Sequence, residues 1–262
     1  MKAIVSDIHS NIEALLVALK DIDKIGIKNE DIYCLGDVIG YGPDPVACLN
    51  IAMNFNFVLL GNHEEAVVNG AFGFHPAAKR AIDWTRKQIK PQVFSSGHKK
   101  RRWEFVRDLP LKIVKKEVLL NGLLFVHGSP RDPTMEYILK VDTEDYFGEV
   151  PPKMKEIFDI IDGPCFVGHS HVPCIITEDC TYHSIEEVGY EYKLEEGEKY
   201  IINIGSVGQP RDHDNKLCYI TLDDEAVVRW HRLEYDFNTT AEKIRAIPDL
   251  DNRNADRLEK GL

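Results

Sequence analysis

Five short apolar runs along the chain share one design. Each is rich in β-branched residues and stops abruptly at a cluster of Gly, Asp, Asn or His; the runs cover residues 2–5, 32–35, 57–60, 123–126 and 165–167. Continuous apolar runs of this length are typical of strands buried on both faces. We therefore predict a largely parallel sheet built from these five strands.

Segments with helical periodicity separate the strands. Apolar residues recur at helical spacing over residues 11–24, behind an Asn or Ser cap, and residues 43–53 carry a proline suited to a first helical turn. Further helices are predicted at 76–89, 96–109, 143–148, 152–161 and 240–247. We expect the polar tail after residue 247 to fray.

From residue 174 onward the pattern turns to strands. They are predicted at 174–177, in a hairpin over 182–194, and at 199–204, 217–222 and 227–233. Neither an internal repeat nor a linker is visible, so we expect residues 1–262 to form a single α/β domain. It would contain two packed, mostly mixed β-sheets flanked by helices, a helical insert at about 64–110 and a strand-rich part from about 174.

Composition indicates an ordinary globular protein. The chain has 262 residues, 44% of them hydrophobic, which is enough for a sizeable core. The first apolar run is too short for a signal peptide, and no later run approaches a membrane span. Six scattered cysteines without a CxxC pair favour buried, reduced thiols. We therefore expect a cytoplasmic protein without membrane contacts.

Net charge disfavours, without excluding, a nucleic-acid partner. The formal charge is −11, whereas contacts with the phosphate backbone require a positive surface. Residues 79–116 depart from this average, with 13 Lys and Arg against three acidic residues. We interpret them first as the solvated faces of two helices; the alternative is a basic rim that attracts a polyphosphate or nucleotide.

Polar side chains gather where the five predicted strands end. They are Asp7, His9, Asp37, Asn62, His127, His169 and His171. Alone, each has an ordinary role as a turn residue, a helix cap or a hydrogen-bonded core histidine. Together they indicate a metal site, because the carboxyl ends of parallel strands meet at one edge of a sheet.

The donor set favours two metal ions over a nucleophilic triad. No serine lies on a nucleophile elbow and no cysteine has an evident base. Mixed nitrogen and oxygen ligands suit Zn²⁺, Mn²⁺, Fe or Ni. Seven ligands are too many for one ion, whereas two divalent ions about 3.5–4 Å apart, bridged by a carboxylate and a water, would use them all.

These motifs resemble the calcineurin-like metallophosphoesterase superfamily. Its pattern runs D-x-H, G-D, G-N-H-[DE], H and G-H-x-H, and every element occurs here in order from Asp7 to His171. The resemblance implies an αββα sandwich and a metal-dependent hydrolase of phosphoric esters, in which a metal-bridging hydroxide attacks phosphorus. It also implies a first metal on Asp7, His9 and His171, a second on Asn62, His127 and His169, a bridging Asp37, and a His63 that stabilises transition-state charge or protonates the leaving oxygen.

Three further stretches resemble a prokaryotic branch of this superfamily. They are Gly36 to Pro43, His127 to Asp132 and Asn203 to Arg211. This branch comprises phosphodiesterase-type and diadenosine-tetraphosphatase-like proteins. It implies a small phosphodiester or phosphoanhydride substrate, such as a dinucleoside polyphosphate or a cyclic nucleotide.

Departures from the superfamily pattern bear on the substrate. Protein phosphatases carry GDxx[DN]RG at the bridging Asp, and their second Asp supports the catalytic His; here Gly40 and Tyr41 occupy the [DN] and Arg positions. A phosphoprotein substrate is therefore disfavoured. Arg131 and Arg211 are candidate phosphate ligands, with a structural role as the equal alternative, and Tyr41 is a candidate to stack on a base.

Three other functions stay open at this point. A metal-dependent nuclease is favoured if the basic insert borders the metal site, a phosphoprotein phosphatase is less expected, and a non-catalytic scaffold conflicts with the complete ligand set. Histidines outside the motifs, among them His75, are expected to be surface or core residues.

Overall fold

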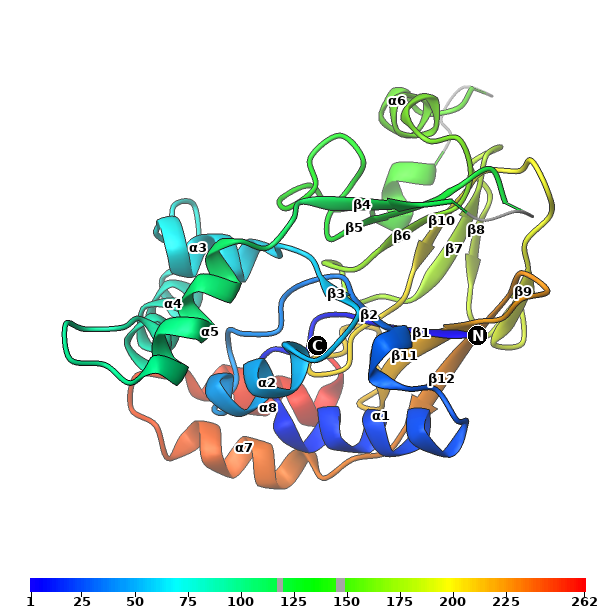
Figure 1. Cartoon of the computed structure of the whole chain (residues 1–262). Helices are drawn as coiled ribbons and strands as arrows, with labels where there is room; N and C mark the ends of the chain where they lie inside the picture. Colours follow the sequence, from blue (N-terminus) through cyan, green and yellow to red (C-terminus); the bar gives the residue numbers. More distant parts are fainter. Residues whose placement is uncertain (117–119, 145–148) are drawn as a thin grey trace.

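Two six-stranded sheets lie face to face, with helices on their outer faces (Figure 1). The computed structural model describes residues 1–116, 120–144 and 149–262. The α/β class and the two mixed sheets flanked by helices confirm the predicted fold.

The first sheet carries the N-terminal strands. Its order is β3-β2-β1-β11-β12-β9. Strands β1, β2 and β3 run parallel to one another, and the remaining neighbours pair antiparallel. The bounds are β1 Lys2–Val5, β2 Ile32–Cys34, β3 Phe57–Val58, β9 Glu191–Lys193, β11 Leu217–Leu222 and β12 Val227–Leu233.

The second sheet has the order β4-β5-β6-β10-β7-β8. Strands β5, β6 and β10 are parallel, while β4, β7 and β8 pair antiparallel with their neighbours. The bounds are β4 Lys112–Lys115, β5 Leu123–Val126, β6 Cys165–Val167, β7 Cys174–Thr177, β8 Tyr182–Ser184 and β10 Tyr200–Asn203.

Alternation along the strands explains why these runs are apolar throughout. In β1, Ile4 points into the core between the two sheets, whereas Ala3 and Val5 point to the helices on the other face. Phe125 and Phe166 stack in the core between the sheets, with ring centroids 5.2 Å apart. Both faces of the central strands are thus removed from water, which requires apolar residues at every position.

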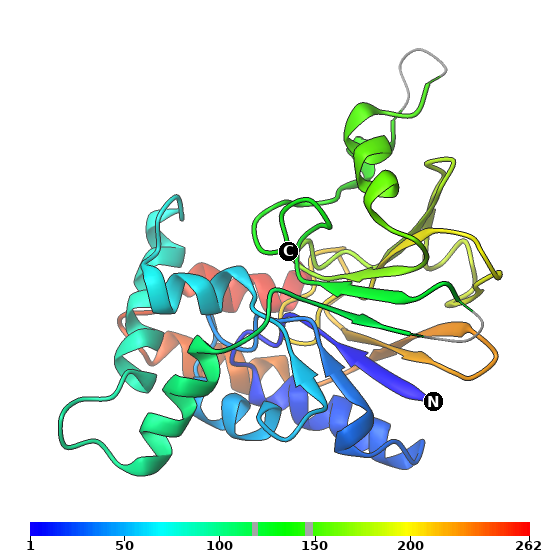
Figure 2. The same ribbon diagram turned by 45° about the horizontal axis from the view of Figure 1, so that its top comes forward.

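Helices cover the outer faces and one side of the sandwich (Figures 1 and 2). α1 and α2 pack on the first sheet and α6 on the second. The insert forms α3 to α5, beside the sheets rather than over them (Figure 2). The bounds are α1 Ile12–Lys24, α2 Pro45–Ala52, α3 Asn62–Asn69, α4 Pro76–Ile89, α5 Gly97–Arg107, α6 Pro152–Ile160, α7 Phe237–Arg245 and α8 Asn252–Lys260, with 3₁₀ turns η1 Asn29–Asp31 and η2 Lys140–Thr143.

The C-terminal tail was expected to fray, and that expectation is wrong. Residues 252–260 form α8, which packs with α4 and α7 in an apolar cluster that includes Ala255 and Leu258. Asp251 caps the start of the helix and Gly261 adopts the left-handed conformation at its end.

The hairpin predicted over 182–194 is also wrong. β8 pairs with β7 in the second sheet, and β9 pairs with β12 in the first. The connection between them crosses from one sheet to the other because Ile185 is buried in the core between the sheets. β4 and α3 were not predicted, and the helix expected at 143–148 falls mostly outside the described residues.

Within residues 1–116, 120–144 and 149–262, no helix combines the length and the apolar character needed to cross a bilayer. All six cysteines are free and buried, in agreement with the expectation of reduced thiols.

Candidate metal centre

Seven polar side chains converge at one edge of the sandwich. All are buried, and they follow the carboxyl ends of strands from both sheets. Strands β1, β2 and β3 of the first sheet lead into Asp7, His9, Asp37 and Asn62; β5 and β6 of the second sheet lead into His127, His169 and His171. The residues selected from the sequence therefore lie together.

The first group consists of Asp7, His9 and His171. His171 Nε2 lies 3.0 Å from Asp7 Oδ1 and 3.1 Å from His9 Nε2. Asp7 Oδ1 is buried and has no hydrogen-bond partner among the described residues. A carboxylate oxygen and two ring nitrogens that face one another in this way fit a divalent cation.

The second group consists of Asp37, His127 and His169, with Asn62 beside them. His127 Nε2 lies 3.1 Å from Asn62 Oδ1, 3.2 Å from His169 Nδ1 and 3.4 Å from Asp37 Oδ2. The same Asp37 Oδ2 lies 3.7 Å from His9 Nε2 of the first group. Asp37 is thus the carboxylate between the two groups.

Hydrogen bonds on the outer side of these side chains orient their metal-binding oxygen and nitrogen atoms toward the site. Asp7 Oδ2 accepts the backbone N–H of His169 at 3.1 Å, and Asp37 Oδ1 accepts that of His63 at 2.9 Å, so each carboxylate keeps its other oxygen for the site. Three histidines face backbone carbonyls with their outer ring nitrogen: His127 toward Leu35, His169 toward Met135 and His171 toward Gln209. Because a carbonyl only accepts, the N–H lies there and the inner nitrogen is free to bind a cation.

The pKa shifts of the four histidines agree with cation binding. Burial lowers the pKa of His9 and His171, and it lowers the pKa of His169 to about 3, so these rings are neutral ligands. Burial acts likewise on His127, but the charge of Asp37 outweighs it and raises the pKa of His127 to about 9. A cation between these two residues takes the place of that proton.

The backbone at the site is held in an uncommon conformation. Asp7, His9, Asp37, His169 and His171 have φ values of 52°, 47°, 51°, 63° and 61°. Non-glycine residues enter this left-handed region at a cost, and only where surrounding structure fixes them. These values point the side chains inward at the strand ends.

Glu64 supports the loop that carries Asp37, a role that sequence reasoning missed. Its buried carboxylate accepts backbone N–H groups from Asp37 at 2.8 Å, Ile39 at 3.0 Å and Gly61 at 3.2 Å. Burial, together with the charge of Asp37, raises the pKa of Glu64 to about 8. A signal was available, because a Glu three residues after a helix cap is typical of a capping box.

His63 and Tyr41 form the wall of the site beside the first group. The ring centroid of His63 lies 4.9 Å from that of His9 and 4.4 Å from that of Tyr41. His63 Nδ1 is buried and has no hydrogen-bond partner in the described part of the chain. Burial lowers the pKa of His63 to about 4, so the ring is neutral near pH 7.

The two candidate arginines have different surroundings. Arg131 forms ion pairs with Glu136 and with Glu156. The Arg211 guanidinium lies over the Tyr41 ring at 5.9 Å and hydrogen-bonds Gln209 Oε1 at 3.0 Å. The geometry therefore favours Arg211 over Arg131 as a group near the metal ligands.

His75, expected to lie outside the site, lines a pocket together with Tyr41 and Arg211. Its ring Nδ1 also accepts the backbone N–H of Ala77 at the start of α4. The proline that follows His75 was the only sign that it precedes a helix, and no sequence signal placed it beside the motifs.

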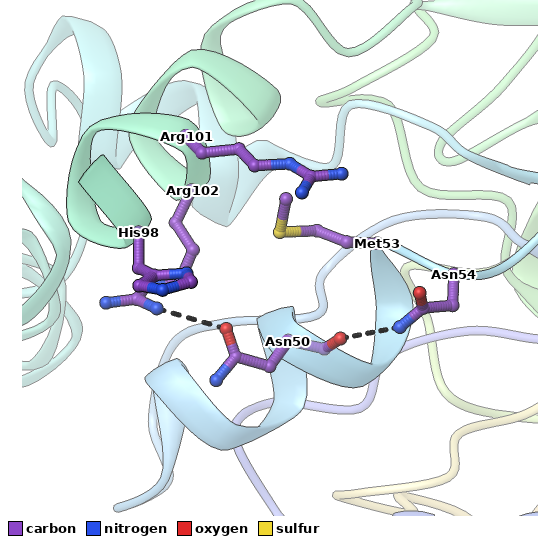
Figure 3. Close-up of a pocket in the computed structure, with 6 residues that line it drawn as sticks. All are labelled: Asn50, Met53, Asn54, His98, Arg101 and Arg102. Carbon is purple, nitrogen blue, oxygen red and sulfur yellow. Dashed lines mark hydrogen bonds between the residues drawn. The ribbon is translucent and has the colours of Figure 1, made fainter.

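Part of the basic segment lines a pocket of its own (Figure 3). This pocket of about 310 Å³ lies between α2 and α5, and its lining includes His98, Arg101 and Arg102 but none of the seven candidate ligands. Arg102 donates to Asn50 Oδ1 at 3.1 Å across it. Elsewhere in the segment, Arg80 pairs with Asp251 at 2.9 Å. Several of the basic charges thus have structural partners.

Comparisons with known proteins agree with this geometry. The family model for calcineurin-like phosphoesterases matches residues 3–203. An uncharacterized protein of Methanocaldococcus jannaschii is 36% identical over 249 residues, which cover 93% of this chain and 91% of that protein. The crystal structure of a metallophosphoesterase from Sphaerobacter thermophilus is 31% identical, with a TM-score of 0.79 and coverage of 99% of this chain and 98% of that one.

A more distant structure shares the fold alone. A hypothetical protein from Pyrococcus horikoshii OT3 is 20% identical, with a TM-score of 0.69 and coverage of 100% of this chain and 98% of that one. The family match spans all seven candidate ligands, and both relatives above 30% identity extend over nearly the whole chain. The chain therefore belongs to the calcineurin-like phosphoesterases, a family of metal-dependent phosphoesterases.

Proposed function

We propose that this protein uses two divalent metal ions to hydrolyse a small phosphodiester or phosphoanhydride, and that this substrate is a nucleotide. The observation that carries the proposal is the shared carboxylate: Asp37 Oδ2 lies 3.7 Å from His9 Nε2 and 3.4 Å from His127 Nε2. Asp7, His9 and His171 would hold the first ion, Asn62, His127 and His169 the second, and Asp37 both.

The chemistry of the ions follows from the donors. When bound, two such cations lower the pKa of water and neutralise charge on phosphoryl oxygens. Mixed nitrogen and oxygen ligands suit Mn²⁺, Fe, Zn²⁺ or Ni²⁺. The protein's own part is to keep Asp37 ionised and the His169 ring neutral, which the lowered pKa of each group supports.

His63 and Arg211 would act on the substrate beside the ions. A neutral His63 ring has one N–H to donate to a phosphoryl oxygen or to the leaving oxygen. Its Nδ1 has no partner among the described residues, so it lacks the Asp partner found in protein phosphatases. Arg211 offers a guanidinium for phosphate oxygens. These features favour a small substrate over a phosphoprotein, in keeping with a phosphodiesterase or diadenosine-tetraphosphatase-like branch.

A nuclease is the second candidate, and the placement of the basic segment weighs against it. A nuclease would use basic residues to follow a phosphate backbone toward the metals. Arg101 and Arg102 instead line a separate pocket with Asn50 (Figure 3).

Hydrolysis of bis(p-nitrophenyl) phosphate with Mn²⁺ tests the proposed centre. Asp37→Asn and His127→Ala are expected to lower kcat/KM by at least about tenfold, because each removes a ligand of the paired ions. His98→Ala, a histidine outside both groups, is the matched control and should keep full activity. A loss below tenfold in both ligand variants would refute the two-metal centre.

A substrate panel then separates the candidate functions. It compares a dinucleoside polyphosphate, a cyclic nucleotide, single-stranded DNA and a phosphopeptide under the same conditions. We expect one of the two nucleotide classes to give the highest kcat/KM. A preference for the phosphopeptide would overturn the interpretation of Gly40 and Tyr41.

A further inference from the structure

A cationic pocket of about 410 Å³ lies directly beside the candidate metal centre. Two tyrosines connect it to the ligands. The Tyr41 ring lies 4.8 Å from the His9 ring, and the Tyr137 ring stacks on the His169 ring at 3.8 Å. The pocket is therefore bordered by neighbours of both metal groups. We call it the α8 pocket, because Arg253, Asn254 and Arg257 of α8 line it together with Arg211 and the two tyrosines.

The charge of the α8 pocket is unbalanced. Three guanidiniums line it, and none of the described lining residues carries a carboxylate. Arg253 is paired with Asp251 at 3.0 Å, whereas within the described ranges no carboxylate lies within 4.0 Å of Arg211 or Arg257. Burial and the nearby positive charge of Arg211 lower the pKa of Arg257. Guanidiniums close enough to repel each other without a counter-ion are stabilised by an anion between them.

Two buried donors in this pocket have no acceptor. Asn254 is only 4% exposed, and its Nδ2 has no hydrogen-bond partner in the part of the chain that the structure describes. The same holds for Nε of Arg211. Buried polar groups are normally paired, because an unpaired donor costs free energy. Both atoms are donors, so the missing partner is an acceptor such as an oxyanion.

α8 is anchored so that these side chains stay in place. Asp251 caps its start and pairs with Arg80 of α4 at 2.9 Å. At the other end, the Gly261 carbonyl accepts the backbone N–H of His213, two residues after Arg211. The helix lies outside residues 3–203, the part that matches the family model. The arginines and Asn254 of the pocket thus lie outside the segment that the family model matches, whereas its two tyrosines lie inside it.

We infer that the α8 pocket binds a second phosphate group of the substrate, next to the phosphate that reacts at the metal centre. This inference rests on the proposed function. An anionic phosphate group with two or more free oxygens matches several guanidiniums and an amide donor. A phosphoanhydride carries such a group beside the reacting phosphorus, whereas a cyclic nucleotide carries only the phosphate under attack. The pocket therefore favours a dinucleoside polyphosphate over a cyclic nucleotide.

The reaction balances as a simple hydrolysis. One water adds across the P–O–P bond: a P–O bond forms at the phosphorus in the metal centre, and its bond to the bridging oxygen breaks. The departing phosphate keeps the bridging oxygen, and the two hydrogens of the water are distributed between the products and the solvent.

Arg257→Gln tests the inference with two substrates. On diadenosine tetraphosphate we expect kcat/KM to fall by at least about tenfold, because one charge-assisted contact to the second phosphate is lost. On bis(p-nitrophenyl) phosphate, which has a single phosphate, the change should stay below about twofold. Asn254→Ala should likewise lower kcat/KM on diadenosine tetraphosphate and leave kcat/KM on bis(p-nitrophenyl) phosphate nearly unchanged. Arg245→Gln, an exposed arginine on α7 that pairs with Asp256, is the matched control and should change neither substrate.

A binding measurement separates this inference from the proposed function. Calorimetric titration with α,β-methylene-ADP, in the presence of Mn²⁺, should show affinity weakened at least about tenfold in Arg257→Gln. Equal losses on both substrates, or unchanged affinity for the analogue, would overturn the second phosphate site. If the wild-type protein cleaves neither substrate, the proposed function fails. The titration still shows whether the α8 pocket binds a phosphate group.

Discussion

At the scale of single residues, Gly40 determines where His63 can lie. Gly40 has φ +101°, and a Cβ built on it would stand 2.2 Å from His63 Nδ1. The imidazole therefore packs against the backbone at the position where protein phosphatases carry an acidic or amide side chain. A glycine at this position offers no side chain to hydrogen-bond His63 Nδ1, which has no partner among the described residues.

Gly40→Ala is expected to lower kcat/KM because it displaces His63. The added methyl group must displace the His63 ring, and a displacement near 1 Å in a catalytic group costs about 10²-fold in rate. Gly26→Ala is the matched control, because Gly26 also has a positive φ of +86° but nothing within 4 Å of its added Cβ. Gly26→Ala should lose about 1 kcal/mol of unfolding free energy from backbone strain. Gly40→Ala should lose about 1–3 kcal/mol more, because the buried His63 ring has to move.

Hydrolysis of the aryl phosphodiester and urea unfolding check this pair. If Gly40→Ala kept wild-type kcat/KM, the imidazole of His63 would not need its observed position. If Gly26→Ala lost activity equally, the loss would come from strain and not from the contact with His63.

At the scale of elements, the strands were the most predictable part of the chain. The predicted bounds of β5, β6, β7, β11 and β12 agree with the structure. β5, β6, β7 and β11 contribute to the cores on both faces, so their sequences are almost continuously apolar and their ends are sharp. β12 also carries polar residues, Arg229, His231 and Arg232, between its apolar ones. β4 was missed because it is an edge strand whose Lys112 is exposed, which leaves a weak pattern.

Elements whose position depends on distant contacts were less predictable. α8 has only Ala255 and Leu258 as apolar anchors, so its sequence resembles a polar tail. Its partners are α4 and α7, which no local pattern brings to it. The separation of β8 from β9 has the same origin, because each strand pairs with a partner that the intervening turn does not specify.

Leu258→Ala tests whether α8 is held by this small core. Leu258 is 2% exposed, and removal of its side chain should lower the free energy of unfolding by about 2–3 kcal/mol. Leu262→Ala, two residues past the helix at a position that is 39% exposed, is the control and should change stability by less than about 0.5 kcal/mol. Urea denaturation measures both; equal midpoints would mean that α8 contributes little to folding.

At the scale of the whole molecule, the metal centre unites the two sheets. The Asp7 carboxylate comes from the first sheet and the His171 ring from the second, 164 residues apart in the chain. The sequence indicated which residues are candidate ligands because each follows a strand. It could not indicate which of them would share an ion, since that depends on how the sheets face one another; the division between two ions came from the family resemblance and stays a prediction.

Because the candidate ligands lie at the junction of the sheets, we expect bound ions to stabilise the fold. Asp7 Oδ1 has no hydrogen-bond partner among the described residues, and the inward ring nitrogens of His9 and His171 face each other at 3.1 Å, where a cation would bind both. A ligand that binds only the folded state raises the free energy of unfolding by about 2.7 kcal/mol at a concentration one hundred times its Kd. For a chain of this size, we expect Mn²⁺ to raise Tm by about 5–10 °C.

Differential scanning calorimetry of metal-free and Mn²⁺-loaded protein measures this effect, and a chelator should reverse it. Asp37→Asn is the decisive comparison, because it weakens the one side chain that lies between both groups. Its Tm should respond to Mn²⁺ by less than half of the wild-type shift, since neither ion keeps its full ligand set. If the variant showed the full wild-type shift, the stabilising ions would bind elsewhere on the protein.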